Sequence, residues 1–213
     1  MLIIFDCDGV LVDSEPLANQ VLAAFLSELG LPHTTAECSA NYVGMSIPSL
    51  IAKVEHETGK SLPKDFHDEL WRRDQIAFAD RLQPIRGIAE TLEQLNGPRC
   101  VASSSAPVRI MNSLTTTGLI GFFEPYLYSA TQVANGKPAP DLFLFAAAEM
   151  GVAPNDCVVI EDSVPGVQAG KAAGMRVLGF SGGGHCGPEQ NGRLNGAGAD
   201  VVFDDMARLI ELL

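Results

Sequence analysis

Short apolar runs rich in β-branched residues alternate along this chain with stretches in which apolar residues recur at helical spacing. The runs predict strands, and the stretches between them predict helices with one buried face. The predicted strands span residues 2–5, 100–102, 126–128, 157–160, 176–180 and 200–203. Because strands that alternate with helices favour a parallel sheet covered on both faces, we expect an α/β fold with a doubly wound sheet.

Residues 15–81 break this alternation, because their pattern is typical of successive helices without a strand. Ser14 suits a helix N-cap, Pro16 suits the first turn, and the apolar stripe that follows ends at Gly30. Since this block falls between the first two predicted strands, we expect an all-helical cap domain inserted into a Rossmann-like α/β core. The expected cap is 15–81, and the expected core is 1–14 and 82–213.

Composition narrows the partners that this fold can have. The 213 residues carry a formal net charge of −12, which argues against binding to nucleic acid or to an anionic membrane. No apolar run reaches the length of about 18 residues that a membrane-spanning helix needs, and the first residues lack the pattern of a signal peptide. The five cysteines form no CxxC pair. We therefore expect a reduced, cytoplasmic chain, monomeric or weakly homo-oligomeric, that acts on a small molecule.

Acidic residues follow two of the predicted strands. Asp6 and Asp8 come directly after the first strand, and Glu161 and Asp162 follow the fourth. Open α/β sheets bind ligands at the carboxyl ends of their strands, so one carboxylate here can attack a substrate while another transfers protons. Converging carboxylates repel one another unless a cation lies among them, and oxygen ligands alone favour Mg²⁺. Taken singly, the pairs also fit an acidic turn at Gly9 and a helix cap at Asp162 or Ser163.

Two further segments carry groups that bind phosphate. Ser103, Ser104 and Ser105 follow the second predicted strand and precede Pro107, so a hydroxyl and the free N–H groups of a helix start can hold an anion. Lys137 lies just before a proline-stiffened stretch that would aim its amine at a fixed place. Taken alone, the serines fit a helix cap, and Lys137 fits an exposed surface lysine.

In this order, the motifs resemble those of the haloacid dehalogenase superfamily, and specifically its β-phosphoglucomutase-like phosphatase branch with a helical cap. The similar stretches are FDCDGVLVDSEP, VASSSA, GKPAPDLF and VVIEDSVPGVQAGKAAGM, and the resemblance extends over nearly the whole chain. It implies a Mg²⁺-dependent phosphatase that hydrolyses a small phosphorylated metabolite, such as a sugar phosphate, through an aspartyl-phosphate intermediate.

The resemblance also implies a role for each motif residue. Asp6 would be the nucleophile, and Asp8 would protonate the leaving oxygen and then activate water. Lys137 and Ser103, with Ser104 beside it, would hold the phosphoryl group. The implied Mg²⁺ ligands are the Asp6 carboxylate, the Asp8 carbonyl and Asp162, with Glu161 close by or linked through water.

Two other functions stay open at this point. A phosphosugar mutase of the β-phosphoglucomutase type resembles the chain throughout, but Ile47 and Ala18 stand where those enzymes have an arginine and a histidine. A phospho-aspartate receiver, which is a signalling module and not an enzyme, also clusters acids with a hydroxyl and a lysine, but it is shorter and has no cap. We expect hydrolysis, with residues 42–47 of the cap setting substrate choice.

One glycine-rich segment, residues 181–192, could cradle a phosphate, but its glycines lack the spacing of known phosphate-binding loops. We expect it to be a long, mobile surface loop. The histidines show no metal-ligand spacing, so exposed or capping roles are expected for His33, His56, His67 and His185.

Overall fold

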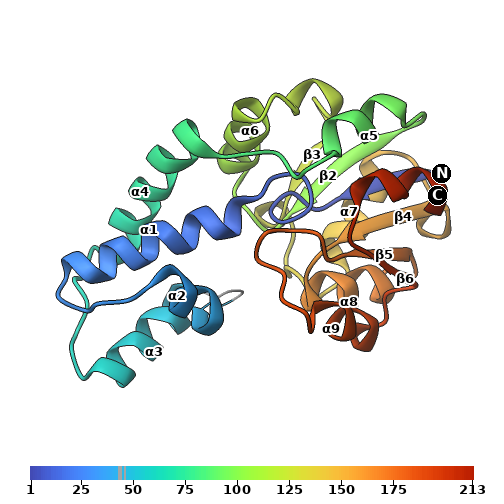
Figure 1. Ribbon diagram of the computed structural model, residues 1–213. Coiled ribbons are helices and arrows are strands. Elements are labelled where there is room, and N and C mark those ends of the chain that lie inside the picture. Colours follow the sequence, from blue (N-terminus) through green and yellow to red (C-terminus); the bar gives the residue numbers. More distant parts are fainter. Residues whose placement is uncertain (43–44, 46) are drawn as a thin grey trace. The chain divides into compact units, whose positions relative to one another are not determined.

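Each apolar run that predicted a strand forms one, although several strand ends shift by a residue. The computed structural model describes residues 1–42, 45 and 47–213. Its strands are β1 (Leu2–Phe5), β2 (Arg99–Ser103), β3 (Leu127–Ser129), β4 (Cys157–Glu161), β5 (Arg176–Phe180) and β6 (Val201–Phe203). They form one parallel sheet in the order β3-β2-β1-β4-β5-β6 (Figure 1). The predicted α/β fold class, a Rossmann-like parallel sheet, is confirmed.

The chain divides into a sheet unit, Met1–Asp13 with Gln83–Leu213, and a helical unit, Ser14–Leu82. The helices of the sheet unit are α5 (Ile88–Gln94), α6 (Pro107–Thr116), α7 (Asp141–Glu149), α8 (Val164–Ala172), α9 (Gln190–Ala197) and α10 (Leu209–Leu212). Short 3₁₀ helices lie at Ile120–Phe122, Ala130–Gln132, Pro154–Asp156 and Met206–Arg208.

The core of the sheet unit fixes its central strand. Leu2 and Ile4 of β1 pack in a buried cluster with Phe143 of α7 and with residues of α8 and α9. The alternate residues of β1 are buried as well, so neither face of this strand meets solvent. A strand held in this way gives the residue that directly follows it a fixed position.

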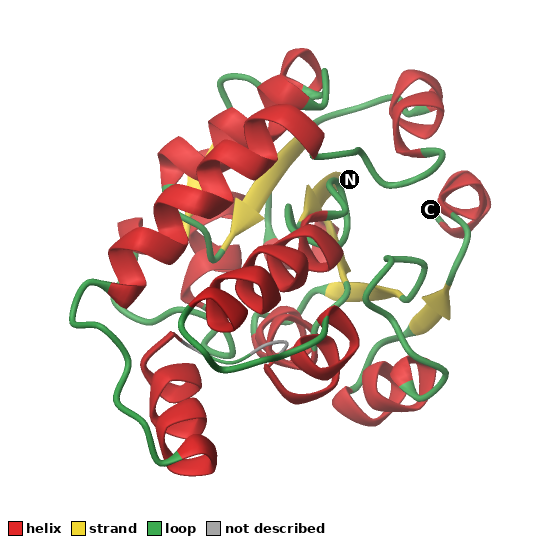
Figure 2. Cartoon of the chain, turned by 60° about the vertical axis from the view of Figure 1, so that its left-hand side comes forward, coloured by secondary structure: helices red, strands yellow, loops and turns green. Residues whose placement is uncertain are grey.

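The regular secondary structure of the second unit consists of helices in the part of it that the structure describes (Figure 2). Its helices are α1 (Ser14–Glu28), α2 (Thr35–Tyr42), α3 (Ile47–Thr58) and α4 (Phe66–Arg81). Helix α1 contacts both α2 and α4, and the ring of Phe25 stacks on that of Phe66 with centroids 4.9 Å apart. The segment expected to set substrate choice, residues 42–47, includes Val43, Gly44 and Ser46, which lie outside the described residues. None of the helices described here combines the length and the apolar character needed to cross a bilayer.

Two segments of the sheet unit, residues 11–13 and 83–85, lie side by side where the chain enters and leaves the helical unit. These segments are the two crossings. The Asp13 N–H donates to the Gln83 carbonyl at 2.9 Å, and the Ile85 N–H donates to the Leu11 carbonyl at 2.9 Å. Between these hydrogen bonds, Val12 pairs with Pro84 in an isolated antiparallel bridge. The helical unit is therefore inserted at one point of the sheet unit.

Candidate active site

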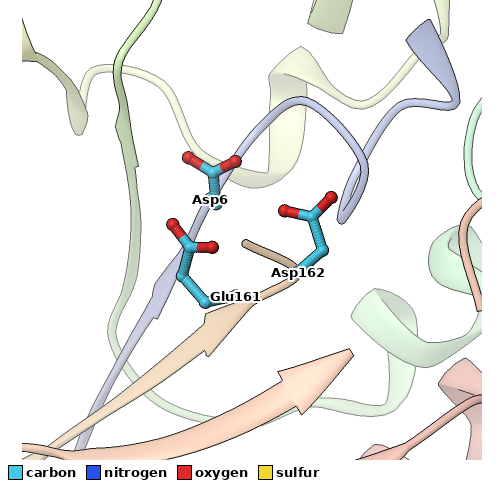
Figure 3. A group of neighbouring side chains, drawn as sticks. All are labelled: Asp6, Glu161 and Asp162. Carbon is cyan, nitrogen blue, oxygen red and sulfur yellow. The ribbon is translucent and has the colours of Figure 1, made fainter. Parts of the chain in front are cut away.

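Three buried carboxyl groups converge at the carboxyl edge of the sheet (Figure 3). Asp6 directly follows β1, Glu161 is the last residue of β4, and Asp162 comes next. Because β1 and β4 are paired neighbours, these side chains meet, and one oxygen of each lies within 4.8 Å of the others. The predicted acids at positions 6, 161 and 162 therefore form one cluster.

Lys137 reaches into this cluster from the segment before α7. Its Nζ donates to Asp6 Oδ1 at 2.6 Å, to Glu161 Oε1 at 2.7 Å and to the Ala102 carbonyl at 3.1 Å. Only 5% of its side chain is exposed. The alternative of a surface lysine is therefore wrong, and the amine is part of the site.

Glu161 has partners for both of its oxygens. Oε1 accepts from Lys137, and Oε2 accepts from the N–H of Ser163 at 2.8 Å and from its hydroxyl at 2.9 Å. Gly166 of α8 lies so close that a Cβ there would overlap the Glu161 carboxylate. Glu161 thus anchors Lys137 and the start of α8, and its oxygens are less available to a metal ion than those of its neighbours.

Asp162 has a different set of partners. Its Oδ2 lies 3.1 Å from Nε2 of His185, and its backbone carbonyl accepts from the side chain of Gln190. Gly9 has a positive φ of 82°, and a Cβ at this position would overlap Asp162 Oδ2. Glycine is needed at position 9 both for the turn and for the close approach of Asp162. The cap of α8 comes from Ser163, whose hydroxyl accepts from Gly166, and not from Asp162.

The charges in this cluster are not balanced by the side chains alone. Burial raises the pKa of Asp6 well above its usual value, and the adjacent Glu161 and Asp162 add to this effect while Lys137 opposes it. Burial also raises the pKa of Asp162. For Lys137, burial alone would lower the pKa, but Asp6 and Glu161 outweigh it and keep the pKa raised. Three carboxylates outnumber the cationic groups beside them, Lys137 and the His185 imidazole, so a small divalent cation would stabilise the site, and the hard oxygen donors fit Mg²⁺.

Asp8 lies outside this group and has its own partners. Its Oδ2 accepts from the Ser105 hydroxyl at 2.7 Å, and its Oδ1 lies 3.4 Å from the guanidinium of Arg109. The Ser105 carbonyl accepts from the Ser129 hydroxyl at 2.7 Å, so Ser105 is itself held in place. The Asp8 side chain is 19% exposed, which gives it the access that a proton-transferring group needs.

The two predicted phosphate-binding serines differ in position. Ser103, the last residue of β2, is buried, and its Oγ accepts from the N–H of Ser105 at 3.1 Å. Ser104 is exposed. Because β2 pairs with β1, Ser103 ends at the same edge of the sheet as Asp6.

Sequence patterns placed Ser105 in the candidate serine run but not beside Asp8. They did not indicate Arg109 or His185 as site residues. Arg109 could have been found from its position in the first turn of the helix that follows β2. His185 was expected to be exposed or capping, and this is wrong, because only 9% of its side chain is exposed. Burial alone would lower its pKa, but the hydrogen bonds to Asp162 and Cys186 raise it to about 10.

Known proteins resemble this chain over most of its length. Residues 1–174 match the model of a hydrolase family, the haloacid dehalogenase-like hydrolases. A 6-phosphogluconate phosphatase of Escherichia coli K12 is 30% identical over 179 residues, which cover 84% of this chain and 81% of that protein.

Solved structures agree closely in fold. A conserved haloacid dehalogenase-like protein of unknown function from Agrobacterium tumefaciens C58 is 40% identical, with a TM-score of 0.91 and coverage of 99% of this chain and 96% of that one. A hydrolase of the same superfamily from Deinococcus radiodurans R1, solved with bound phosphate and sodium, is 36% identical, with a TM-score of 0.86 and coverage of 98% and 92%.

Proposed function

This chain belongs to the haloacid dehalogenase-like hydrolases, and we propose that it hydrolyses small phosphorylated metabolites, such as sugar phosphates, with Mg²⁺ as cofactor and Asp6 as nucleophile. Its similarity to a named phosphatase already identifies it as a phosphoric monoester hydrolase. The observation that carries the finer proposal is the Lys137 amine, which binds Asp6 and Glu161 within a buried carboxylate cluster.

Asp6 begins the proposed reaction. Lys137 occupies its Oδ1, which leaves Oδ2 to attack phosphorus. A new Oδ2–P bond forms as the bond from phosphorus to the leaving oxygen breaks, and the product is an aspartyl phosphate. Because the fold holds the Asp6 carboxylate in a fixed direction, less entropy is lost when it meets the phosphorus atom.

Asp8 moves the protons in both steps. In its acid form it protonates the leaving oxygen, and as a carboxylate it then takes a proton from the attacking water. Water adds to phosphorus as the bond to Asp6 breaks, which releases phosphate and restores both aspartates. The contacts with Ser105 and Arg109 hold the Asp8 carboxylate in place.

The remaining polar groups bind and orient the phosphoryl group. Lys137 supplies a buried positive charge, and Ser103 supplies a hydroxyl at the end of β2. The Asp6 carboxylate, the Asp8 carbonyl and Asp162 would hold Mg²⁺, with Glu161 close by or linked through water. When bound there, Mg²⁺ supplies positive charge that offsets both the carboxylates and the phosphate.

A screen of phosphorylated metabolites with and without Mg²⁺ tests the proposal, with phosphate release as the readout. We expect hydrolysis of sugar phosphates and of related phosphorylated acids, and loss of activity when the metal is chelated. Conversion of β-glucose 1-phosphate to glucose 6-phosphate at a rate equal to hydrolysis would contradict the proposed reaction and favour the mutase.

The nucleophile is tested by Asp6→Asn. Turnover should fall by at least about 10³-fold, because an amide cannot form the acyl phosphate. The far-UV circular dichroism spectrum should not change. Asp68→Asn is a matched control, since 89% of the Asp68 side chain is exposed and the helical unit carries it. Full activity of Asp6→Asn would mean that another group attacks.

A further inference from the structure

The glycine-rich segment after β5 lies against the acid cluster. Hydrogen bonds anchor it at several points: the Ser181 N–H donates to the Phe203 carbonyl at 2.8 Å, and the Gly184 N–H donates to Asp13 Oδ1 at 2.9 Å. Farther along, Gln190 at the start of α9 donates to the Asp162 carbonyl. These contacts tie the segment to the loops that follow β1 and β4.

The anchored segment places one imidazole on Asp162. His185 Nε2 lies 3.1 Å from Asp162 Oδ2, and the two side chains are only 9% and 8% exposed. Two glycines leave room for this pair: a Cβ at Gly9 would overlap Asp162, and a Cβ at Gly183 would lie 2.9 Å from His185 Nδ1. The pair is therefore enclosed by backbone on both sides.

The direction of this hydrogen bond follows from the donor and acceptor groups. A carboxylate oxygen accepts only, so Nε2 must carry the proton. Nδ1 is buried and has no partner among the described residues. The imidazolium and the neutral tautomer with its proton on Nε2 can both donate to Oδ2, so the contact does not depend on the charge of the ring.

We propose that His185 is a positioning residue that fixes Oδ2 of Asp162 and thereby aims the other oxygen of this carboxylate at the divalent cation. Partners of this kind set the orientation of metal-binding side chains, and their loss typically weakens metal affinity by about 10-fold to 100-fold. The inference rests on the proposed role of Asp162 as a Mg²⁺ ligand, and it gives the glycine-rich segment a function in the same site.

Mg²⁺ binding to the full chain, measured by isothermal titration calorimetry without substrate, tests the inference. His185→Leu removes the donor, whereas His185→Gln keeps an N–H donor at nearly the place of Nε2. We expect His185→Leu to weaken Mg²⁺ binding by about 10-fold or more, and His185→Gln to stay within a few fold of the wild type. His67→Gln is the matched control and should bind Mg²⁺ as the wild type does, because 64% of the His67 side chain is exposed.

Kinetics gives a second readout. Extra Mg²⁺ should restore the kcat of His185→Leu, because the loss is in metal binding and not in the attack by Asp6. Mg²⁺ binding by His185→Leu that equals or exceeds that of the wild type would overturn the inference while leaving the proposed function intact. Equal losses in the Leu and Gln variants would overturn it too, since they would point to packing of the ring. Failure of the wild-type protein to bind Mg²⁺ would overturn the proposed metal site and this inference together.

Discussion

The two aspartates of the first motif share one kind of side chain but have different surroundings. Asp6 is buried and accepts from Lys137, whereas Asp8 is partly exposed and is held by Ser105 and Arg109. A carboxylate that attacks phosphorus needs a fixed direction and a nearby cation. A carboxylate that exchanges protons needs access to the leaving group and to water. The surroundings of each aspartate match the role proposed for it.

Replacing Ser105 tests whether proton transfer by Asp8 depends on the orientation of its carboxylate. Ser105→Ala removes the 2.7 Å hydrogen bond to Asp8 Oδ2. We expect kcat to fall by about 10-fold to 100-fold, with little change in KM, because proton transfer depends on the direction of the Asp8 carboxylate. Steady-state kinetics on one phosphorylated substrate measures both constants.

The control for this variant lies on the same stretch of chain. Thr116 is exposed near the end of α6, so Thr116→Ala should leave kcat unchanged. An unchanged kcat in Ser105→Ala would mean that Asp8 is positioned without this hydrogen bond.

At the scale of elements, three adjacent strands position the site residues. β2, β1 and β4 are neighbours in the sheet, and Ser103, Asp6 and Glu161 lie at their carboxyl ends. This placement could be predicted from the sequence, because apolar runs locate parallel strands and parallel strands end at a common edge. The pairing partners of each carboxylate could not be predicted in this way, since they depend on side-chain directions.

The segment after β5 shows the limit of sequence patterns more clearly. Its glycines indicated a loop on the surface, but its conformation depends on Asp13, Asp162 and Phe203, which are distant in sequence or belong to other elements. The expected loop was also too long, because α9 begins at Gln190. The glycine content shows that many backbone conformations are possible here, and contacts with distant residues determine which one forms.

Helix α7 supports the site residue Lys137 through Phe143. This side chain is fully buried in the core cluster, and its ring centroid lies 5.0 Å from Lys137 Nζ. Phe143→Ala should lower the free energy of unfolding by about 3–5 kcal/mol, because it removes a large buried ring and leaves a cavity. Urea denaturation followed by circular dichroism measures the change.

The next residue of α7 gives the comparison for that experiment. Leu144 is 38% exposed, so Leu144→Ala should change stability by about 0.5 kcal/mol or less. A similar loss of stability in both variants would mean that any truncation in α7 has this effect and that the burial of Phe143 does not explain it.

At the scale of the whole molecule, the net charge of −12 opposes the approach of an anionic substrate. Raising NaCl from about 10 mM to 150 mM shortens the screening length from about 30 Å to about 8 Å. We therefore expect kcat/KM for a phosphorylated substrate to rise over this range at saturating Mg²⁺. The buried cation Lys137 is screened less, so binding within the site should be preserved.

A surface charge variant makes this prediction specific. Glu90 and Glu93 are exposed on α5, and changing both to lysine makes the chain less negative without touching the site residues. The rise of kcat/KM with salt should become smaller in this double variant. A fall of kcat/KM with salt in the wild type would mean that local positive groups, and not the net charge, govern the encounter.

The two crossings into the helical unit are fastened to each other within the sheet unit, by the Asp13–Gln83 hydrogen bond and the pairing of Val12 with Pro84. The ends of the insertion are thus closed at the crossings, and the strands do not have to hold them together. Because closure entropy grows only slowly with the length of the enclosed chain, we expect this point to tolerate insertions of very different size. Inserted segments can therefore evolve here as interchangeable modules while Asp6 keeps its geometry.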